Sequence, residues 1–163
     1  MPQVLILMGS DSDAPVMQAA VETLREFGIT SEMTVASAHR SPERVMRLVS
    51  EAPGRGVKVF IVGAGAAAHL GGVVAAHSTL PVIGVPIDSS ALKGLDALLS
   101  TVQMPPGVPV ATVSIGKPGA TNAAVLSAQI LGVADGAMAQ KLVEYKKKLA
   151  EKVDAAAAKL APA

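Results

Sequence analysis

The sequence predicts an α/β protein built on a parallel sheet, with helices on both faces and a long helix near the C-terminus. Short runs of consecutive apolar residues recur along the chain, beginning at residues 4–8. Such runs are typical of strands buried on both faces of a parallel sheet. Each run precedes a helical pattern, and strands that alternate with helices form three-layered, flavodoxin-like or Rossmann-like sheets. The chain of 163 residues is expected to form a single domain over residues 1–163.

The expected strands are short apolar runs that end at turn residues. They lie at residues 4–8, 33–36, 57–62, 82–85 and 110–113. Pro86 directly follows the fourth run and is expected to close that strand.

Helices are expected between these strands, at residues 13–27, 43–51, 67–79 and 93–99. The first carries its apolar residues on one helical stripe, and Gly28 follows it where a left-handed C-terminal cap is favoured. Ser41 and Pro42 suit the N-cap and the first position of the second helix.

Two further helical segments follow the sheet. Residues 120–132 are apolar or small on nearly every side, so this helix is expected to be buried, and it suits the core of an oligomer. Residues 136–160 are amphipathic and predict a helix more than about 30 Å long, which suits packing across a neighbouring subunit. Its cluster of lysines is expected to be a solvent-exposed face. Residues 155–163 are expected to fray.

Composition argues against several classes of function. The formal net charge is only +1 and 2% of residues are aromatic, so binding to nucleic acid is not expected. The absence of cysteine excludes disulfides and thiolate chemistry. No apolar run approaches the roughly 20 residues that span a membrane, and no signal peptide is evident, so a cytoplasmic location is expected. No metal-ligand cluster or complete dinucleotide signature occurs, and no metal or cofactor is expected.

Three loops in the first half of the chain combine small residues with hydroxyl, imidazole or guanidinium groups. Residues 9–13, 37–40 and 63–69 each follow an expected strand and precede an expected helix. In an open parallel sheet such positions lie at one edge, where these folds bind their ligands. The sequence therefore predicts one pocket for a phosphorylated small molecule, with two imidazoles beside an anion site.

The side chains of these loops suit that role. Ser10 and Asp13 are typical helix-capping residues, and the free N–H groups of the same turn also attract an anion. Arg40 adds positive charge at a helix start, and the imidazole of His39 belongs to the side-chain type that exchanges protons near neutral pH. His69 follows a run of Gly and Ala residues that lets a ligand lie against the backbone, but it suits a solvent-exposed helix start equally well.

Several blocks of the sequence occur together and in the same order in one enzyme family. These blocks are Met8-Gly9-Ser10-Asp11-Ser12-Asp13, Ser37-Ala38-His39-Arg40-Ser41-Pro42, Gly63-Ala64-Gly65, His69-Leu70, Val102-Gln103-Met104-Pro105 and residues 122–131. In these blocks the chain resembles the N5-carboxyaminoimidazole ribonucleotide mutase family of purine biosynthesis over about residues 3–133. The family usually has a glycine where this chain has Ala66 and a proline where it has Gly71. We expect Ala66 to place a methyl group beside the ligand and Gly71 to loosen the turn.

The resemblance implies an isomerase, forming a homo-octamer, that moves a carboxylate from the exocyclic nitrogen to carbon 4 of an imidazole ribonucleotide without a metal or cofactor. Under this reaction His39 is expected to protonate the nitrogen and later to remove the proton from carbon 4. His69 is expected to hold the migrating carboxylate or carbon dioxide. Ser10, Asp13 and Arg40 are expected to anchor the ribose phosphate. Further substrate contacts are expected from Gly9, Ser37, Ala38, Gly65, Ala66, Ala67 and Leu70.

Other functions are also compatible with these residues. A related branch carboxylates aminoimidazole ribonucleotide directly with carbon dioxide; its third loop lacks the histidine, so His69 favours the mutase. A non-catalytic nucleotide-binding module would use Ser10 and Arg40 but would leave His39 without a task. A flavin site is less favoured, because no aromatic residue is placed to stack on the ring. A transient contact with the ATP-dependent carboxylase that supplies the substrate is compatible with the mutase.

Overall fold

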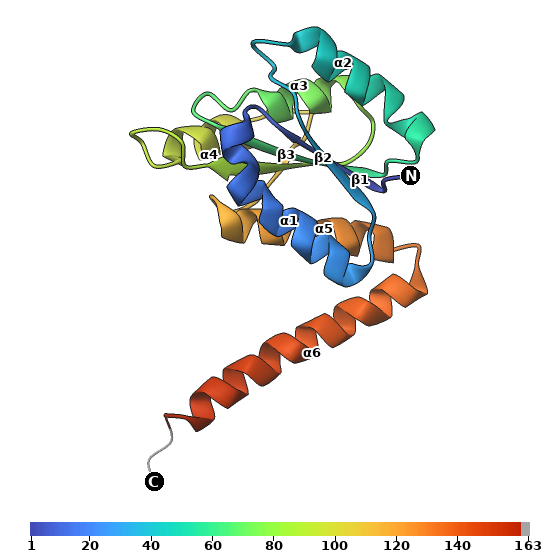
Figure 1. The fold of residues 1–163 in the computed structure, drawn as a ribbon, viewed down its shortest axis with the longest axis vertical. Coiled ribbons are helices and arrows are strands. Elements are labelled where there is room, and N and C mark those ends of the chain that lie inside the picture. Colours follow the sequence, from blue (N-terminus) through green and yellow to red (C-terminus); the bar gives the residue numbers. More distant parts are fainter. Residues whose placement is uncertain (161–163) are drawn as a thin grey trace. The chain divides into compact units, whose positions relative to one another are not determined.

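The computed structural model describes residues 1–160, which form the strands and helices shown in Figure 1. Within these residues, five parallel strands form one sheet with the order β2-β1-β3-β4-β5. The strands are β1 (Val4–Met8), β2 (Ser31–Val35), β3 (Val59–Gly65), β4 (Val82–Ile87) and β5 (Ala111–Thr112). The predicted α/β class with a parallel, flavodoxin-like sheet is thus confirmed.

Helices connect the strands and follow the sheet. They are α1 (Ala14–Phe27), α2 (Pro42–Glu51), α3 (Leu70–His77), α4 (Leu95–Val102), α5 (Lys117–Gly132) and α6 (Gly136–Ala158), with short 3₁₀ turns η1 (Asp11–Asp13) and η2 (Pro53–Arg55). By its contacts the chain divides into one compact unit over Met1–Ser127 and a second from Ala128 onward, and each is described by itself. The sheet and all three predicted site loops belong to the first unit.

Both faces of the sheet are covered, because alternate residues of its strands point to opposite sides. Helices α2 and α3 lie on one side, and α1 and the first part of α5 lie on the other (Figure 1). On the first side, Leu5 and Phe60 pack in one hydrophobic cluster with Val45 of α2 and Val74 of α3. This tight core fixes the carboxyl ends of the central strands, from which the site loops emerge.

Glycine brings α1 close to the centre of the sheet. A Cβ added to Gly63 in β3 would lie 2.5 Å from Sδ of Met17, and Met17 is fully buried in α1. At the end of α1, Gly28 adopts a left-handed conformation with φ 75° and receives the cap that the sequence predicts.

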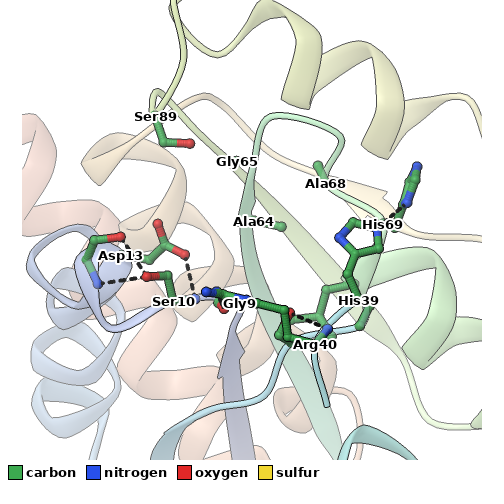
Figure 2. Close-up of a pocket in the computed structure, with 14 residues that line it drawn as sticks. Gly9, Ser10, Asp13, His39, Arg40, Ala64, Gly65, Ala68, His69 and Ser89 are labelled. Carbon is green, nitrogen blue, oxygen red and sulfur yellow. Dashed lines mark hydrogen bonds between the residues drawn. The ribbon is translucent and has the colours of Figure 1, made fainter. Parts of the chain in front are cut away.

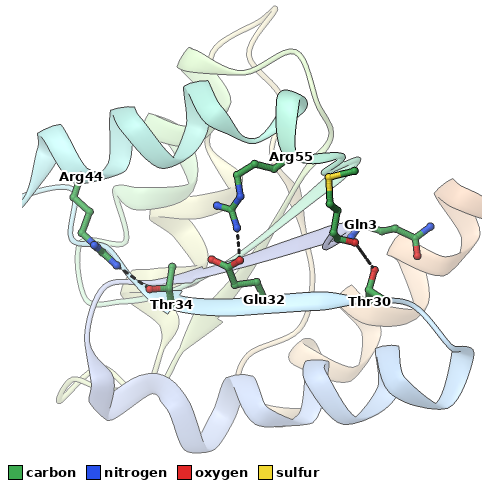
Figure 3. Close-up of polar contacts among 7 residues, drawn as sticks. Gln3, Thr30, Glu32, Thr34, Arg44 and Arg55 are labelled. Carbon is green, nitrogen blue, oxygen red and sulfur yellow. Dashed lines mark hydrogen bonds and ion pairs between the residues drawn. The ribbon is translucent and has the colours of Figure 1, made fainter.

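Two arginine side chains bond to residues of the edge strand β2 (Figure 3). Arg55 pairs with Glu32, while Arg44 donates to the Thr34 hydroxyl at 2.9 Å and to the Val35 carbonyl at 2.8 Å. At the start of the strand, the Gln3 N–H donates to the Thr30 hydroxyl at 3.2 Å. Charged cover of this kind protects an unpaired sheet edge against pairing with other chains.

The predicted end of the fourth strand is wrong. Pro86 does not close β4, which continues to Ile87 and pairs Pro86 with Ala64 of β3. The carbonyl of Pro86 accepts a hydrogen bond from the N–H of Gly116. The nitrogen of Pro86 faces the same side of the strand as this carbonyl, where the two-residue strand β5 has already ended. No strand N–H is needed there, and the proline is therefore tolerated.

Helix α5 begins at Lys117, earlier than predicted, and only one of its faces is buried. In the first unit, Ala120, Ala123 and Ala124 are fully buried, whereas Asn122 is exposed.

In the second unit, the Asp135 side chain caps α6 by accepting from the N–H groups of Ala137 and Met138. The predicted stripe along α6 is largely exposed in the single chain, with Val153 at 68%. The helix includes residues 155–158, and residues 161–163 of the expected fraying tail lie outside the described residues.

Candidate active site

Four loops at the carboxyl ends of β1 to β4 enclose a cavity of about 340 Å³ (Figure 2). The sequence predicts three of these loops. Most of the predicted site residues line the cavity, namely Gly9, Ser10, Asp13, Ser37, Ala38, His39, Arg40, Gly65, His69 and Leu70. Segments far apart in the chain are therefore brought together, as expected at the strand ends of a parallel sheet.

The first loop is a locally satisfied capping turn. The Ser10 hydroxyl accepts from the Ser12 N–H at 3.3 Å, and the Asp13 carboxylate accepts from the Ser10 N–H at 3.2 Å. These reciprocal bonds form a capping box around η1. Asp13 itself makes no side-chain cap on α1, so the predicted capping acts on the preceding turn. Ser10 and the start of the turn remain on the cavity wall, where an anion is favoured.

Burial makes the Asp13 carboxyl unusual. Its side chain belongs to a residue only 5% exposed, and this burial raises the pKa of Asp13, with a smaller contribution from the nearby negative charge of Asp11. The N–H of Ser10 opposes the shift because it stabilises the ionised form. Burial disfavours the ionised form of this carboxylate, yet it lies on the cavity wall. It therefore fits a role in accepting hydrogen bonds from hydroxyl groups of a ligand.

Arg40 links the second loop to the first. Its guanidinium Nη2 donates to the carbonyl of Gly9 at 3.0 Å, and its backbone N–H donates to the Ser37 hydroxyl at 3.2 Å. Ser41 stands at the predicted N-cap, but its hydroxyl donates to the Ser37 carbonyl at 3.2 Å instead of capping α2. The loop is thereby closed on itself, and it presents the cation of Arg40 beside Gly9 (Figure 2).

The two histidines of the cavity contact each other directly. Nε2 of His39 lies 2.6 Å from Nδ1 of His69, and the ring centroids are 4.8 Å apart at an interplanar angle of 79°. A hydrogen bond between two ring nitrogens requires a hydrogen on one and a lone pair on the other. One ring therefore donates to the other, on the opposite side of the view from Ser10 and Asp13 (Figure 2).

The third loop, which carries His69, has two alanines in a disfavoured backbone conformation. Ala66 and Ala68 have φ values of 51° and 46°, in the left-handed region that disfavours alanine. The turn leaves Ala66 and Ala67 exposed, and neither lines the cavity, so the methyl group of Ala66 does not face the ligand space. Gly71 does not loosen a turn either, because it lies buried in the first turn of α3.

The cavity also includes residues that the sequence analysis missed. Ser12, Ala64, Ala68 and Ser89 line it in addition to the predicted set. Ser89 follows β4 and could have been found by the rule that identified the other loops. A Cβ on Gly65 would lie 1.8 Å from Oγ of Ser89, so a larger residue at position 65 would displace Ser89 where these two loops meet.

Within residues 1–160, no three His, Cys, Asp or Glu side chains gather closely enough to hold a metal ion. In the same range, no helix is both long and apolar enough to cross a membrane.

Comparisons with known proteins agree with the family that the sequence blocks resemble. Residues 3–152 match the family model described as AIR carboxylase, where AIR is aminoimidazole ribonucleotide. The N5-carboxyaminoimidazole ribonucleotide mutase of Thermotoga maritima is 54% identical over 94% of this chain and 88% of its own length. The protein of the same name from Mycobacterium tuberculosis is 52% identical over 98% of this chain and 90% of its own length.

One further relative and one solved structure are also similar to this chain. The phosphoribosylaminoimidazole carboxylase of Saccharomyces cerevisiae is 51% identical over 98% of this chain, which covers only 28% of that longer protein. Among solved structures, that of Treponema denticola PurE has a TM-score of 0.89 and 31% identity, over 99% of this chain and 100% of that one.

Proposed function

Because the chain belongs to the AIR carboxylase family, we propose that it is a mutase that converts N5-carboxyaminoimidazole ribonucleotide to 4-carboxy-5-aminoimidazole ribonucleotide in purine biosynthesis. The relatives that carry the mutase name are matched over most of their own length, whereas the yeast carboxylase is matched over 28%. The observation that carries the proposal is the His39–His69 contact of 2.6 Å in the cavity.

The cavity has two chemically different ends, which set the orientation of the ribonucleotide. Ser10 and Arg40 supply a hydroxyl, a helix-start turn and a cation for the phosphate. The buried Asp13 carboxylate accepts hydrogen bonds from the ribose hydroxyls. This leaves the imidazole base of the substrate at His39 and His69.

The first half of the reaction breaks the bond between nitrogen and the carboxylate. His39 donates a proton to the exocyclic nitrogen, the bonding electron pair stays on that nitrogen, and carbon dioxide is released. Positioned proton transfer of this kind typically accelerates a reaction about 100- to 10,000-fold. His69 lies within reach to hold the carboxylate as it departs and to orient the ring of His39.

The second half forms the new bond between carbon 4 and the same carbon dioxide. The free amine makes carbon 4 nucleophilic, and carbon 4 attacks carbon dioxide that is retained in the cavity. Carbon 4 then carries both a hydrogen and the new carboxylate, and His39 removes this proton to restore the aromatic ring. The proton donated in the first half is thus recovered, and the overall reaction is an isomerisation that needs no metal or cofactor.

The same proposal includes a homo-octamer in the cytoplasm, with transient contact to the ATP-dependent carboxylase that supplies the substrate. Exposed apolar side chains on and before α4 support self-association, since Leu92, Leu95 and Leu99 are 63%, 54% and 52% exposed in the single chain. Sedimentation equilibrium tests this part: eight subunits support it, and a monomer at micromolar concentration contradicts it.

A paired assay without ATP or metal tests the reaction. One sample receives N5-carboxyaminoimidazole ribonucleotide, and the other receives aminoimidazole ribonucleotide with a low concentration of bicarbonate. Fast formation of the 4-carboxylate in the first sample alone is expected of the mutase. Efficient formation in the second identifies a direct carboxylase. Ribonucleotide binding without turnover in either sample identifies a non-catalytic binding module.

A further inference from the structure

The loop that carries His69 is held in a conformation that its own sequence disfavours. Ala66 and Ala68 are both left-handed, with φ values of 51° and 46°, and only glycine adopts this region freely. Backbone of this kind persists only where the surrounding structure imposes it, and it is concentrated at functional sites. The contacts that impose it here therefore bear on the position of His69.

A hydrogen bond from α4 ties this loop to the rest of the fold. The hydroxyl of Ser100 donates to the carbonyl of Ala67, which lies between the two left-handed residues. Inside the loop, the Ala68 N–H donates to the Gly65 carbonyl at 3.0 Å. Within residues 1–160, His39 and Ser100 are the side chains from elsewhere in the chain that hydrogen-bond to residues 66–69.

The neighbouring residue shows that this bond is not the usual behaviour of a helical hydroxyl. Thr101 donates to the carbonyl of Ala97 in its own helix, at 2.7 Å, as Ser and Thr commonly do in helices. Ser100 instead reaches a residue 33 positions earlier in the chain. The Ser100 hydroxyl is thus committed to the histidine loop and not to α4.

Ser100 acts from behind the substrate cavity. It does not line that cavity, but lines a second one of about 330 Å³ that shares Ala68 and His69 with it. The Ser100 side chain is therefore separated from the substrate by the loop itself. The bond that it makes to Ala67 is its link to the substrate cavity.

We propose that Ser100 is a positioning residue, whose hydroxyl holds the strained loop at residues 66–68 so that His69 stays in contact with His39. This inference rests on the proposed function, because it concerns the same pair of histidines. Its chemical consequence is specific. Loss of the hydroxyl disturbs the end of the cavity where the carboxylate moves, and leaves the phosphate end at Ser10 and Arg40 intact.

The test compares Ser100→Ala and Ser100→Thr with Ser50→Ala. The Ser50 control removes a similar hydroxyl, which donates to the Arg47 carbonyl in α2 at 2.9 Å, and Ser50 does not line the cavity. Ser100→Ala is expected to lower kcat about 10- to 100-fold, the size of effect that a misplacement of about 1 Å produces. KM and the product dissociation constant are expected to change by no more than about twofold. Ser100→Thr, which keeps the hydroxyl, and Ser50→Ala are expected to resemble the unchanged protein.

Relief of the strain provides a second arm of the test. Ala66→Gly, introduced into Ser100→Ala, is expected to restore part of the lost kcat, because glycine adopts the required backbone without the hydroxyl. Ala67→Gly is the matched control, since its residue is not left-handed, and it is expected to restore nothing. Equal restoration by both glycines would overturn the argument from strain.

Other outcomes also overturn the inference. An unchanged kcat in Ser100→Ala would show that the hydroxyl does not matter. An equal loss of kcat in Ser100→Thr would show that the loss in Ser100→Ala does not come from the hydroxyl. A raised KM with normal kcat would make Ser100 a binding residue.

If the unchanged protein proves inactive, the proposed function fails, but the positioning role remains testable. A crystal structure of Ser100→Ala is then expected to show His39 and His69 separated beyond hydrogen-bonding distance. An unchanged pair would contradict the inference.

Discussion

The two ends of the cavity are built in different ways. At the anion end, Ser10 and Asp13 form a capping box of ordinary turn geometry, and Arg40 closes onto the Gly9 carbonyl at 3.0 Å. At the histidine end, His69 follows two left-handed alanines. The capping box of the first end is stabilised by local sequence, to which Arg40 adds one contact from the second loop, whereas the left-handed backbone of the second end depends on contacts from elsewhere in the fold.

This difference fits the separate tasks of the two ends. Binding a phosphate needs fixed donors, which a capped turn and a bonded arginine provide. Moving a proton needs two ring nitrogens at a particular distance, and here the strained loop holds Nδ1 of His69 2.6 Å from Nε2 of His39. The comparison therefore predicts that variants at one end change affinity, and that variants at the other change turnover.

The largest effect is expected at the histidine end. His39→Asn removes the group that donates and recovers the proton, so kcat should fall by about 100- to 10,000-fold. The asparagine keeps a polar side chain of similar size, and the product dissociation constant should change little. Steady-state kinetics together with calorimetric titration of the product measure both quantities. Near-normal kcat would remove His39 from the chemistry.

A smaller effect, and of the opposite kind, is expected at the anion end. Arg40→Ala removes a charge-assisted contact to phosphate, which is typically worth about 1.5–3 kcal/mol, so affinity should fall about 10- to 100-fold. At saturating substrate, kcat should be largely retained. Arg47→Ala is the matched control, because Arg47 is exposed on α2 and does not line the cavity. A fall in kcat without a change in KM would contradict the assignment of this end.

A stability effect is expected at the strained loop. Ala66→Gly removes a left-handed alanine that costs about 1–2 kcal/mol, offset by the greater freedom of glycine in the unfolded chain. Ala67→Gly adds that freedom without relieving strain. The free energy of unfolding should therefore be about 1–2 kcal/mol higher for Ala66→Gly than for Ala67→Gly. Denaturant titration of both variants measures this difference, and its absence would mean that the loop is not strained at residue 66.

The smallest effect is expected at Asp13. Burial raises the pKa of Asp13, so the folded state binds a proton more tightly than the unfolded state does. The contribution of this group to stability is fully present below the ordinary pKa of aspartate, about 3.9, and is lost as pH rises through the raised value. The asparagine of Asp13→Asn does not ionise, so its contribution to stability is not lost as pH rises. Its side-chain oxygen can still accept a hydrogen bond from the Ser10 N–H.

The free energy of unfolding of Asp13→Asn at pH 7 should accordingly be slightly higher than that of the unchanged protein, because the variant carries no buried charge there. The difference should shrink as the pH is lowered towards 4. Denaturant titrations at several pH values measure it. A variant that is less stable at pH 7 would show that the carboxylate is needed for structure and not held there for binding.

Much of the fold and of the anion end follows from local sequence. Continuous apolar runs such as residues 4–8 indicate buried parallel strands, and the strand order places their carboxyl ends together. Ser10 and Asp13 form their capping box within four residues of chain, so the pattern is visible in the sequence. The cavity wall at His39 and Arg40 follows from the same rule of strand ends.

The histidine end could not be predicted in the same way. Left-handed backbone is normally marked by glycine, and alanine at positions 66 and 68 conceals it. The contact between His39 and His69 joins loops that are 30 residues apart, and the bond from Ser100 to Ala67 spans 33. The sequence predicts the end of β4 wrongly for a related reason. Only the short length of β5 leaves the nitrogen of Pro86 without a strand partner, and this is not visible around Pro86 in the sequence.

The most direct test of the two-ended cavity is a crystal structure of the protein with bound 4-carboxy-5-aminoimidazole ribonucleotide. We expect phosphate oxygens within about 3.2 Å of the Ser10 hydroxyl and the Arg40 guanidinium. We also expect the carboxylate of carbon 4 beside His39 and His69. A ligand bound in the reverse orientation, with its phosphate at the histidines, would show that the two ends do not have these tasks.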